Sequence, residues 1–175
     1  MNKNSPAYLA LFLAVTAGIA GGALYGANSL TAPVIKANAE KAEKASLLEM
    51  YPDASIDDFV VVDAEDIIAD HPSVQGVYKY GDDIVIFKNS VSGYDGGTVF
   101  LVAINAAKDT VDSFKAISNG DTKGIGSKIT ENAFAESVKG KQASGQLDTI
   151  SGATFTSKPV VEAINECAEI APTVE

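Results

Sequence analysis

The chain has 175 residues, a formal net charge of −10 and one histidine. A chain of this length has room for one ordinary domain and one extra segment, which excludes a second catalytic domain. Each of its 13 basic residues is a lysine, so the arginine side chains that favour binding to a phosphate backbone are absent, and we expect no nucleic acid partner.

The only cysteine, Cys167, cannot form an intramolecular disulfide, and we expect it to be a small buried residue on the apolar side of a helix. No Cys/His cluster is present to hold zinc or an iron–sulfur centre, so we expect no metal site. Any redox cofactor of this chain must therefore be organic.

A short N-terminal tail, residues 1–6, precedes the apolar run AYLALFLAVTAGIAGGALYGANSL at residues 7–30. About 20 helical residues cross a bilayer core, so this run predicts a single transmembrane helix that contacts lipid. A cleaved signal peptide is the alternative, but the uncharged stretch is longer than a signal core. Lysines flank the run on both sides, so charge alone leaves its orientation open and permits a domain outside the cytoplasm.

Residues 31–53 are rich in Ala, Glu, Lys and Leu and predict a linker helix, which is either a stalk or the first helix of the domain. Tyr51-Pro52-Asp53 is expected to end it. Residues 54–175 then form one domain. Short β-rich runs lie at residues 59–62, 76–80, 83–89, 98–105 and 113–118.

The connections between these runs are short, which favours antiparallel neighbours, since a parallel crossover needs a dozen or more residues. A short helix is predicted at residues 131–140, and an amphipathic helix closes the chain, with Ser157 as its cap and Pro159 in its first turn. The predicted fold class is α+β, an antiparallel sheet covered by helices.

The stretch DTISGATFTSK, residues 148–158, leads into that last helix and carries more hydroxyl groups than one helix cap requires. Unpaired N–H groups and the positive end of the helix dipole gather at a helix start and favour a phosphate. Gly152 allows close backbone approach, Ala153 leaves space, Thr154 presents a hydroxyl and Lys158 adds positive charge. The alternative is a capping loop without a ligand.

The pattern Asp-x-x-Ser-Gly-Ala-Thr, from Asp148 through Ser151 to Thr154, closely resembles the flavinylation signature of FMN-binding domains. The resemblance implies one FMN per chain, bonded through its phosphate to the Thr154 hydroxyl. A separate flavin transferase is implied as well, because a threonine hydroxyl is a weak nucleophile and no activating group is evident nearby. Two roles stay open for Asp148: recognition by the transferase, or an Asx hydrogen bond that fixes the turn.

The resemblance extends over nearly the whole chain. The membrane helix, the segment LTAPVIKANAEKAEKASLLEMYP, then GYDGGTVFLVAIN, NGDTKGIGSKI and the SGAT turn are similar, in this order, to the G subunit (RnfG) of the Rnf ion-translocating electron-transport complex. Family members commonly read His-x-Glu-Thr-Pro-Gly-Leu-Gly where this chain has residues 119–126. By this resemblance the flavin contacts include Thr122, Gly124, Ile125 and Gly126. Aromatic packing on the ring is expected from Tyr94 or Phe155, for each of which core or loop packing is the alternative.

The resemblance implies a subunit that carries electrons through FMN, without independent catalysis, in a membrane-bound ferredoxin:NAD oxidoreductase complex. Its partners would be the other membrane subunits, and its C-terminal domain would lie on the extracytoplasmic side of the cell membrane. The alternatives are a free-standing membrane-anchored flavoprotein, an NqrC-like member of the sodium-pumping NADH:quinone oxidoreductase, and a non-redox binding module. We expect His71 to be exposed in a turn and the Glu-rich face of the last helix to be solvated.

Overall fold

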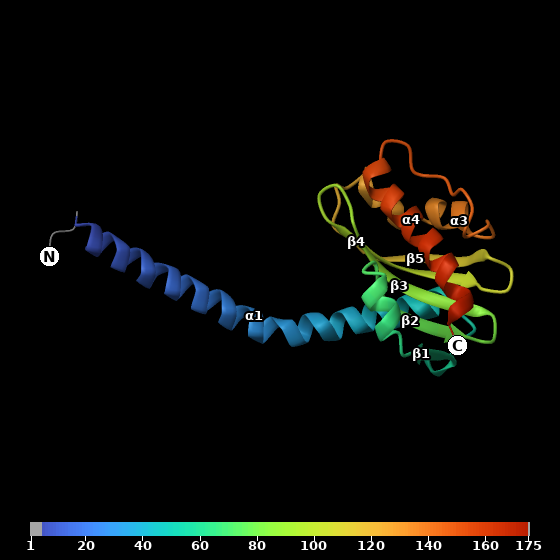
Figure 1. The fold of residues 1–175 in the computed structure, drawn as a ribbon, viewed down its shortest axis with the longest axis horizontal. Coiled ribbons are helices and arrows are strands. Elements are labelled where there is room, and N and C mark those ends of the chain that lie inside the picture. The colour runs from blue at the N-terminus through green and yellow to red at the C-terminus, as the bar shows by residue number, and fades with distance from the viewer. Residues whose placement is uncertain (1–4, 175) are drawn as a thin grey trace. The chain divides into compact units, whose positions relative to one another are not determined.

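The computed structural model describes residues 5–174 (Figure 1). The chain divides into two compact units, Met1–Ala42 and Glu43–Glu175. Residues 1–4 of the predicted N-terminal tail lie outside the described residues. Helix α1 runs from Pro6 to Met50 and ends directly before Tyr51-Pro52, as the sequence predicts.

Within the first unit, α1 is an apolar helix whose side chains are exposed. It is the one helix among residues 5–174 that is long and apolar enough to cross a membrane. In this unit, its serine and threonine hydroxyl groups are bonded within the helix: Thr16 Oγ1, for example, donates to the carbonyl of Phe12 at 2.9 Å, and Thr31 Oγ1 donates to that of Ala27 at 3.0 Å. Such internal hydrogen bonds are what an apolar solvent requires of polar groups.

The second unit is built on a five-stranded antiparallel sheet with the order β1-β2-β3-β4-β5. The strands are β1 (Phe59–Val62), β2 (Val74–Tyr80), β3 (Ile84–Ser92), β4 (Gly97–Asn105) and β5 (Thr110–Asn119). Each strand pairs with the next along the chain, since the connections are short. The predicted antiparallel sheet and the α+β class are confirmed.

The helices of the second unit are short except for the last. They are α2 (Glu65–Asp70), α3 (Asn132–Val138) and α4 (Thr154–Ile170), with 3₁₀ turns at Ile56–Asp58, Gly126–Thr130 and Ala171–Thr173. Helix α4 lies across one face of the sheet (Figure 1). Helix α2 is missing from the predicted elements, because six residues are too few to show a helical period.

Successive residues of the central strands serve two different cores, because side chains alternate across a sheet. Phe100 and Val102 of β4 point into the core beneath α3 and α4. Leu101 and Ala103 point into a smaller core on the opposite face, which Leu47 of α1 completes. All four β4 side chains are fully buried. The sheet is therefore covered on both faces.

The last turns of α1 are part of this second unit, which begins at Glu43. Glu43 is buried, and its carboxylate pairs with Lys88 Nζ of β3 at 2.6 Å and accepts a hydrogen bond from the Tyr78 hydroxyl of β2. Beyond the helix, the Tyr51 hydroxyl donates to Asp112 at 2.6 Å. The end of the segment 31–53 thus packs on the sheet as a domain helix.

The last helix also makes polar contacts with the loop that follows α2. Glu166 of α4 accepts a hydrogen bond from the Ser73 hydroxyl at 2.6 Å and lies 2.7 Å from His71 Nδ1. The expectations of a fully exposed His71 and of a wholly solvated Glu face were wrong. The turn folds back onto α4, and a 95-residue separation in sequence hides that pairing.

Candidate functional site

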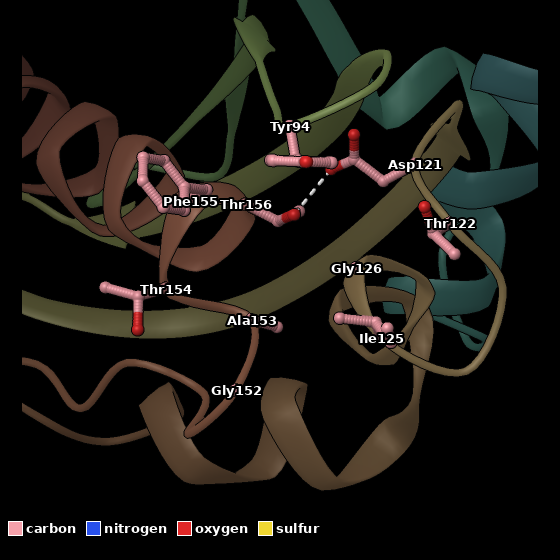
Figure 2. Close-up of a pocket in the computed structure, with 10 residues that line it drawn as sticks. All are labelled: Tyr94, Asp121, Thr122, Ile125, Gly126, Gly152, Ala153, Thr154, Phe155 and Thr156. Carbon is pink, nitrogen blue, oxygen red and sulfur yellow. Dashed lines mark hydrogen bonds between the residues drawn. The ribbon is translucent and has the colours of Figure 1, made fainter.

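A cavity of about 310 Å³ opens at the N-terminal end of α4 (Figure 2). Three segments form it: the loop between β3 and β4, the segment that follows β5, and the loop that leads into α4. Its volume lies at the lower end of the range for small-molecule sites. The lining residues are Tyr94, Asp121, Thr122, Ile125, Gly126, Gly152, Ala153, Thr154, Phe155 and Thr156.

The helix at this cavity begins four residues earlier than predicted, since the cap is residue 153 and not residue 157. Thr154 is its first residue and Ala153 is its N-cap. Gly152 has φ +80°, a left-handed conformation that glycine adopts without strain and that reverses the chain just before the helix. Consequently Pro159 lies in the second helical turn, and the prediction that placed it in the first turn was wrong.

Ser157 is not the helix cap but a buried brace inside the first turn. Its hydroxyl accepts the N–H of Ile150 at 2.9 Å and donates to the carbonyl of Ala153 at 3.0 Å. The prediction followed the rule that a hydroxyl-bearing residue directly precedes a helix and caps it. Here Ser157 is the fourth residue of the helix. The side chain instead fixes the loop of residues 150–153 against the helix that follows.

The hydroxyl groups of this loop differ sharply in their availability. Thr156 is 2% exposed and donates to Asp121 Oδ2 at 2.5 Å, and Ser157 is fully buried. Thr154 is exposed at the mouth of the cavity, and its hydroxyl points away from the Asp121–Thr156 hydrogen bond (Figure 2). Ser151 is exposed too, but it does not line the cavity. Among the hydroxyl groups of residues 148–158, the one that is both exposed and at the cavity belongs to Thr154.

The cavity sits at the start of a helix of 17 residues. The first N–H groups of a helix have no intrahelical acceptor, and they carry the positive end of the helix dipole. A phosphate is favoured at such a position. Lys158, which the sequence analysis placed here, is exposed, does not line the cavity, and has its ammonium group 3.6 Å from Glu162.

Two exposed aromatic side chains form the rim of the cavity. Tyr94 and Phe155 are each 76% exposed, and their ring centroids are 6.0 Å apart. Ile125, across the opening, is 52% exposed. Large apolar side chains gathered around one opening are typical of a site that binds a flat apolar group. Phe155 thus lines the cavity together with Tyr94.

Sequence reasoning missed two of the lining residues, Asp121 and its hydrogen-bond partner Thr156. Asp121 is only 9% exposed, although it lies in the stretch NGDTKGIG, which by itself indicates only a turn. Its Oδ1 accepts the N–H groups of Asp95 and Gly96 at 2.8 and 2.9 Å. Burial opposes ionisation, but the hydrogen bonds from Thr156 and from this backbone outweigh it and hold the pKa of Asp121 below its usual range. The signal in the sequence was that this acidic residue lies between two glycine-rich stretches, residues 93–97 and 124–126.

The structure brings most of the predicted site residues to this one cavity. They are Tyr94, Thr122, Ile125, Gly126, Gly152, Ala153 and Thr154. Gly124 instead forms a turn with φ +81°, and its N–H donates to Ser127 Oγ at 2.8 Å. Asp148 is exposed and pairs with Lys141 Nζ at 2.7 Å, which holds the pKa of its carboxyl below the usual range.

The residues present fit a bound flavin mononucleotide. The helix start suits its phosphate, the exposed Thr154 hydroxyl suits a phosphoester, and the rim of Tyr94, Ile125 and Phe155 suits an apolar ring. Among residues 5–174, no charged side chain other than Asp121 lines the cavity. Because a carboxylate repels a phosphate, the phosphate is favoured at the Thr154 end of the cavity, away from Asp121.

Comparison with known proteins agrees with this geometry. Residues 93–169 match the FMN-binding domain family. The chain is 29% identical over 142 residues to the G subunit of the ion-translocating oxidoreductase complex of Methanosarcina acetivorans, a match that covers 73% of each chain. It is 28% identical over 88 residues to the G subunit of the proton-translocating ferredoxin:NAD(+) oxidoreductase complex of Clostridium ljungdahlii, covering 44% of this chain and 47% of that one.

Two solved structures are also similar. NqrC of Shewanella oneidensis is 23% identical, with 51% of this chain and 53% of that chain covered and a TM-score of 0.46. The C subunit of the Na(+)-translocating NADH-quinone reductase of Parabacteroides distasonis is 24% identical, with 55% and 60% covered and a TM-score of 0.44. The matched residues 93–169 hold every residue that lines the cavity, and the two G subunits extend the likeness along the chain. The chain therefore matches the FMN-binding domain family over residues 93–169 and is similar to the G subunits of ion-translocating oxidoreductase complexes.

Proposed function

We propose that this protein is an electron-carrying subunit of a membrane-bound, ion-translocating ferredoxin:NAD oxidoreductase complex, and that its FMN is bonded to Thr154 through a phosphoester. The observation that carries the proposal is the exposed Thr154 hydroxyl, which lies at the start of α4 and at the mouth of the cavity. The neighbouring hydroxyls of Thr156 and Ser157 are buried and hydrogen-bonded. Attachment at Thr154 thus requires no rearrangement of the helix.

The attachment is a group transfer with FAD as the donor. The Thr154 oxygen forms a bond to the phosphorus of the FMN moiety, the bond between the two phosphates of FAD breaks, the hydroxyl proton is lost and AMP leaves. Within the part of the chain that the structure describes, the cavity offers no base to the Thr154 hydroxyl, because its one carboxylate, Asp121, is occupied by Thr156 and two backbone N–H groups. A separate flavin transferase would supply the activation.

Once bound, the flavin would supply one- or two-electron redox chemistry. The chain contributes position and environment: the helix start holds the phosphate, and Tyr94, Phe155 and Ile125 flank the ring. Their exposure leaves the ring open to an electron-transfer partner. The chain would have no turnover of its own, and ion translocation would belong to the other membrane subunits, because one apolar helix cannot conduct ions.

Covalent attachment is tested on a denaturing gel viewed under ultraviolet light, because only a covalently bound flavin stays with the band. Wild-type protein from its native host should be fluorescent, with an intact mass raised by one FMN phosphoester. Thr154→Val should abolish both signals. Thr149→Val is the matched control, since Thr149 is an exposed threonine of the same loop outside the cavity. A fluorescent Thr154→Val band would show that another residue is the acceptor.

Membership of a complex is tested by co-purification. We expect several membrane subunits to be recovered with the chain in mild detergent, and recovery of the chain alone would favour a free-standing membrane-anchored flavoprotein. Residues 7–30 would cross the bilayer once and place the domain on the extracytoplasmic side. A cysteine introduced at the exposed Ser144 should react with a membrane-impermeant maleimide in intact cells, while the buried Cys167 stays silent. Labelling only after lysis would place the domain in the cytoplasm.

A further inference from the structure

Asp121 joins two parts of the cavity that are far apart in sequence. One carboxylate oxygen accepts the backbone N–H groups of Asp95 and Gly96 in the loop between β3 and β4. The other accepts the hydroxyl of Thr156 in the first turn of α4 at 2.5 Å (Figure 2). Hydrogen bonds to an ionised carboxylate are about twice as strong as neutral ones.

The backbone closes tightly around this carboxylate. A side-chain carbon added at Gly93 would lie 2.0 Å from Asp121 Oδ2, and one added at Gly126 would lie 2.5 Å from Asp121 Cβ. Real side chains do not approach so closely, so both positions require glycine as long as Asp121 keeps its place. The glycine-rich loops therefore have a physical purpose, which is to let two loops and a helix start meet at one side chain.

The same contacts decide where the aromatic rim lies. Tyr94 directly precedes Asp95, and Phe155 directly precedes Thr156. Both rings are 76% exposed, so little core packing holds them. Their positions depend on the backbone segments that Asp121 connects, which leave the ring centroids 6.0 Å apart.

We propose that Asp121 is a positioning residue that holds the Tyr94 loop against the first turn of α4 and keeps a negative charge beside the flavin ring. The first part of the proposal, the position of the Tyr94 loop, concerns the chain alone and holds whether or not a flavin is attached. The second part, the negative charge beside the flavin ring, rests on the proposed flavin site. The charge disfavours the additional negative charge of a reduced flavin, so it lowers the reduction potential.

The first part is tested by hydrogen exchange on the full chain in mild detergent, produced without a flavin transferase. In the wild type, the N–H groups of Asp95 and Gly96 should be protected. In Asp121→Asn their exchange should be roughly 10- to 100-fold faster, since their charged acceptor is lost. Asp95→Asn is the matched control, because it makes the same charge change on an exposed side chain of the same loop. Its Gly96 N–H should remain protected.

Thr156 provides a second pair of variants in case Asp121→Asn folds poorly. Thr156→Val removes the hydroxyl and should speed exchange in the loop, and Thr156→Ser keeps the hydroxyl and should restore the protection. A purely steric role of residue 156 would give the opposite order, since valine matches the shape of threonine better than serine does. Equal exchange in wild type, Asp121→Asn and Thr156→Val would overturn the proposal.

The second part is tested by redox titration of the flavinylated chain. Asp121→Asn should shift the midpoint potential to more positive values, and Asp95→Asn should shift it less, since water screens an exposed charge. An unchanged potential in Asp121→Asn would overturn this part. If the wild type carries no flavin, the proposed function fails, and the exchange measurements on the unmodified chain still decide whether Asp121 holds the loop.

Discussion

The buried hydroxyl of Ser157 should control both the stability of the domain and the loading of flavin. In Ser157→Ala the N–H of Ile150 loses its acceptor, and the Ala153 carbonyl loses one of its donors. An unsatisfied buried group costs about 1–3 kcal/mol, which the better helix propensity of alanine offsets by roughly 0.5 kcal/mol. A net loss of about 1–2 kcal/mol is therefore expected.

That loss corresponds to a fall in Tm of about 3–8 °C for a domain of this size. Near-ultraviolet circular dichroism follows the melting of the domain through its packed tyrosines, Tyr51, Tyr78 and Tyr80, while Tyr8 and Tyr25 of the membrane helix contribute a signal that stays constant as long as that helix remains in detergent. Ser157→Ala protein incubated with flavin transferase and FAD should acquire covalent flavin more slowly than the wild type, because the loop before Thr154 has lost its hydrogen bond to the helix.

Ser151→Ala is the matched control, since Ser151 is exposed in the same loop. It should leave Tm within about 2 °C of the wild type, as is usual for surface substitutions. The proposed role of Ser157 would be refuted if Ser157→Ala melted like Ser151→Ala and acquired flavin like the wild type. A lower Tm with unchanged flavinylation would show that Ser157 stabilises the helix but does not set the geometry of the loop.

Two further predictions concern the opposite face of the sheet and the contacts of α4. Leu47→Ala should lower the free energy of unfolding by about 2–4 kcal/mol and the urea midpoint by about 1–2 M, because Leu47 is only 1% exposed. Leu48→Ala is the control: Leu48 is 37% exposed, and the free energy of unfolding should fall by less than about 1 kcal/mol. The pKa of Glu166 is lowered, since hydrogen bonds from Ser73 and His71 and the charge on His71 outweigh the opposing effect of burial. Its contribution to stability is present above the unfolded-state pKa and is lost as pH falls through the folded-state value, so Glu166→Gln should flatten the decline in urea stability below about pH 5.

Each of these predictions has a contradicting outcome. Equal urea midpoints for Leu47→Ala and Leu48→Ala would show that the end of α1 does not pack on the sheet. Glu162→Gln, on the exposed side of α4, is the control for the pH series and should keep the wild-type slope. A wild-type slope in Glu166→Gln as well would mean that its pairing contributes nothing to acid stability.

The strands were predictable because their signal is local. The five apolar runs and their turns were recognised within a few residues, and short connections implied antiparallel pairing before any contact was known. The start of α4 was misplaced for the converse reason. In the local sequence, a hydroxyl residue shortly before a proline indicates a helix cap. In the structure Ser157 is buried inside the helix, where its hydroxyl bonds to the backbone of Ile150 and Ala153.

The contents of the cavity were predictable only in part. Thr154 and its small neighbours were identified from one contiguous motif. Asp121 was missed, because its partners Asp95 and Thr156 lie 26 and 35 residues away along the chain. The pairing of Glu43 with Lys88 was missed likewise, since 45 residues separate them.

The sequence by itself determined the apolar N-terminal helix, the antiparallel α+β class and the loop that presents a threonine hydroxyl, because each follows from side-chain periodicity or from a motif of neighbouring residues. Tertiary structure alone decided which of the clustered hydroxyls stays accessible and which carboxylate joins the two loops. Burial and hydrogen bonding between distant segments are set by how the sheet, α4 and the loops pack, and no local pattern encodes them.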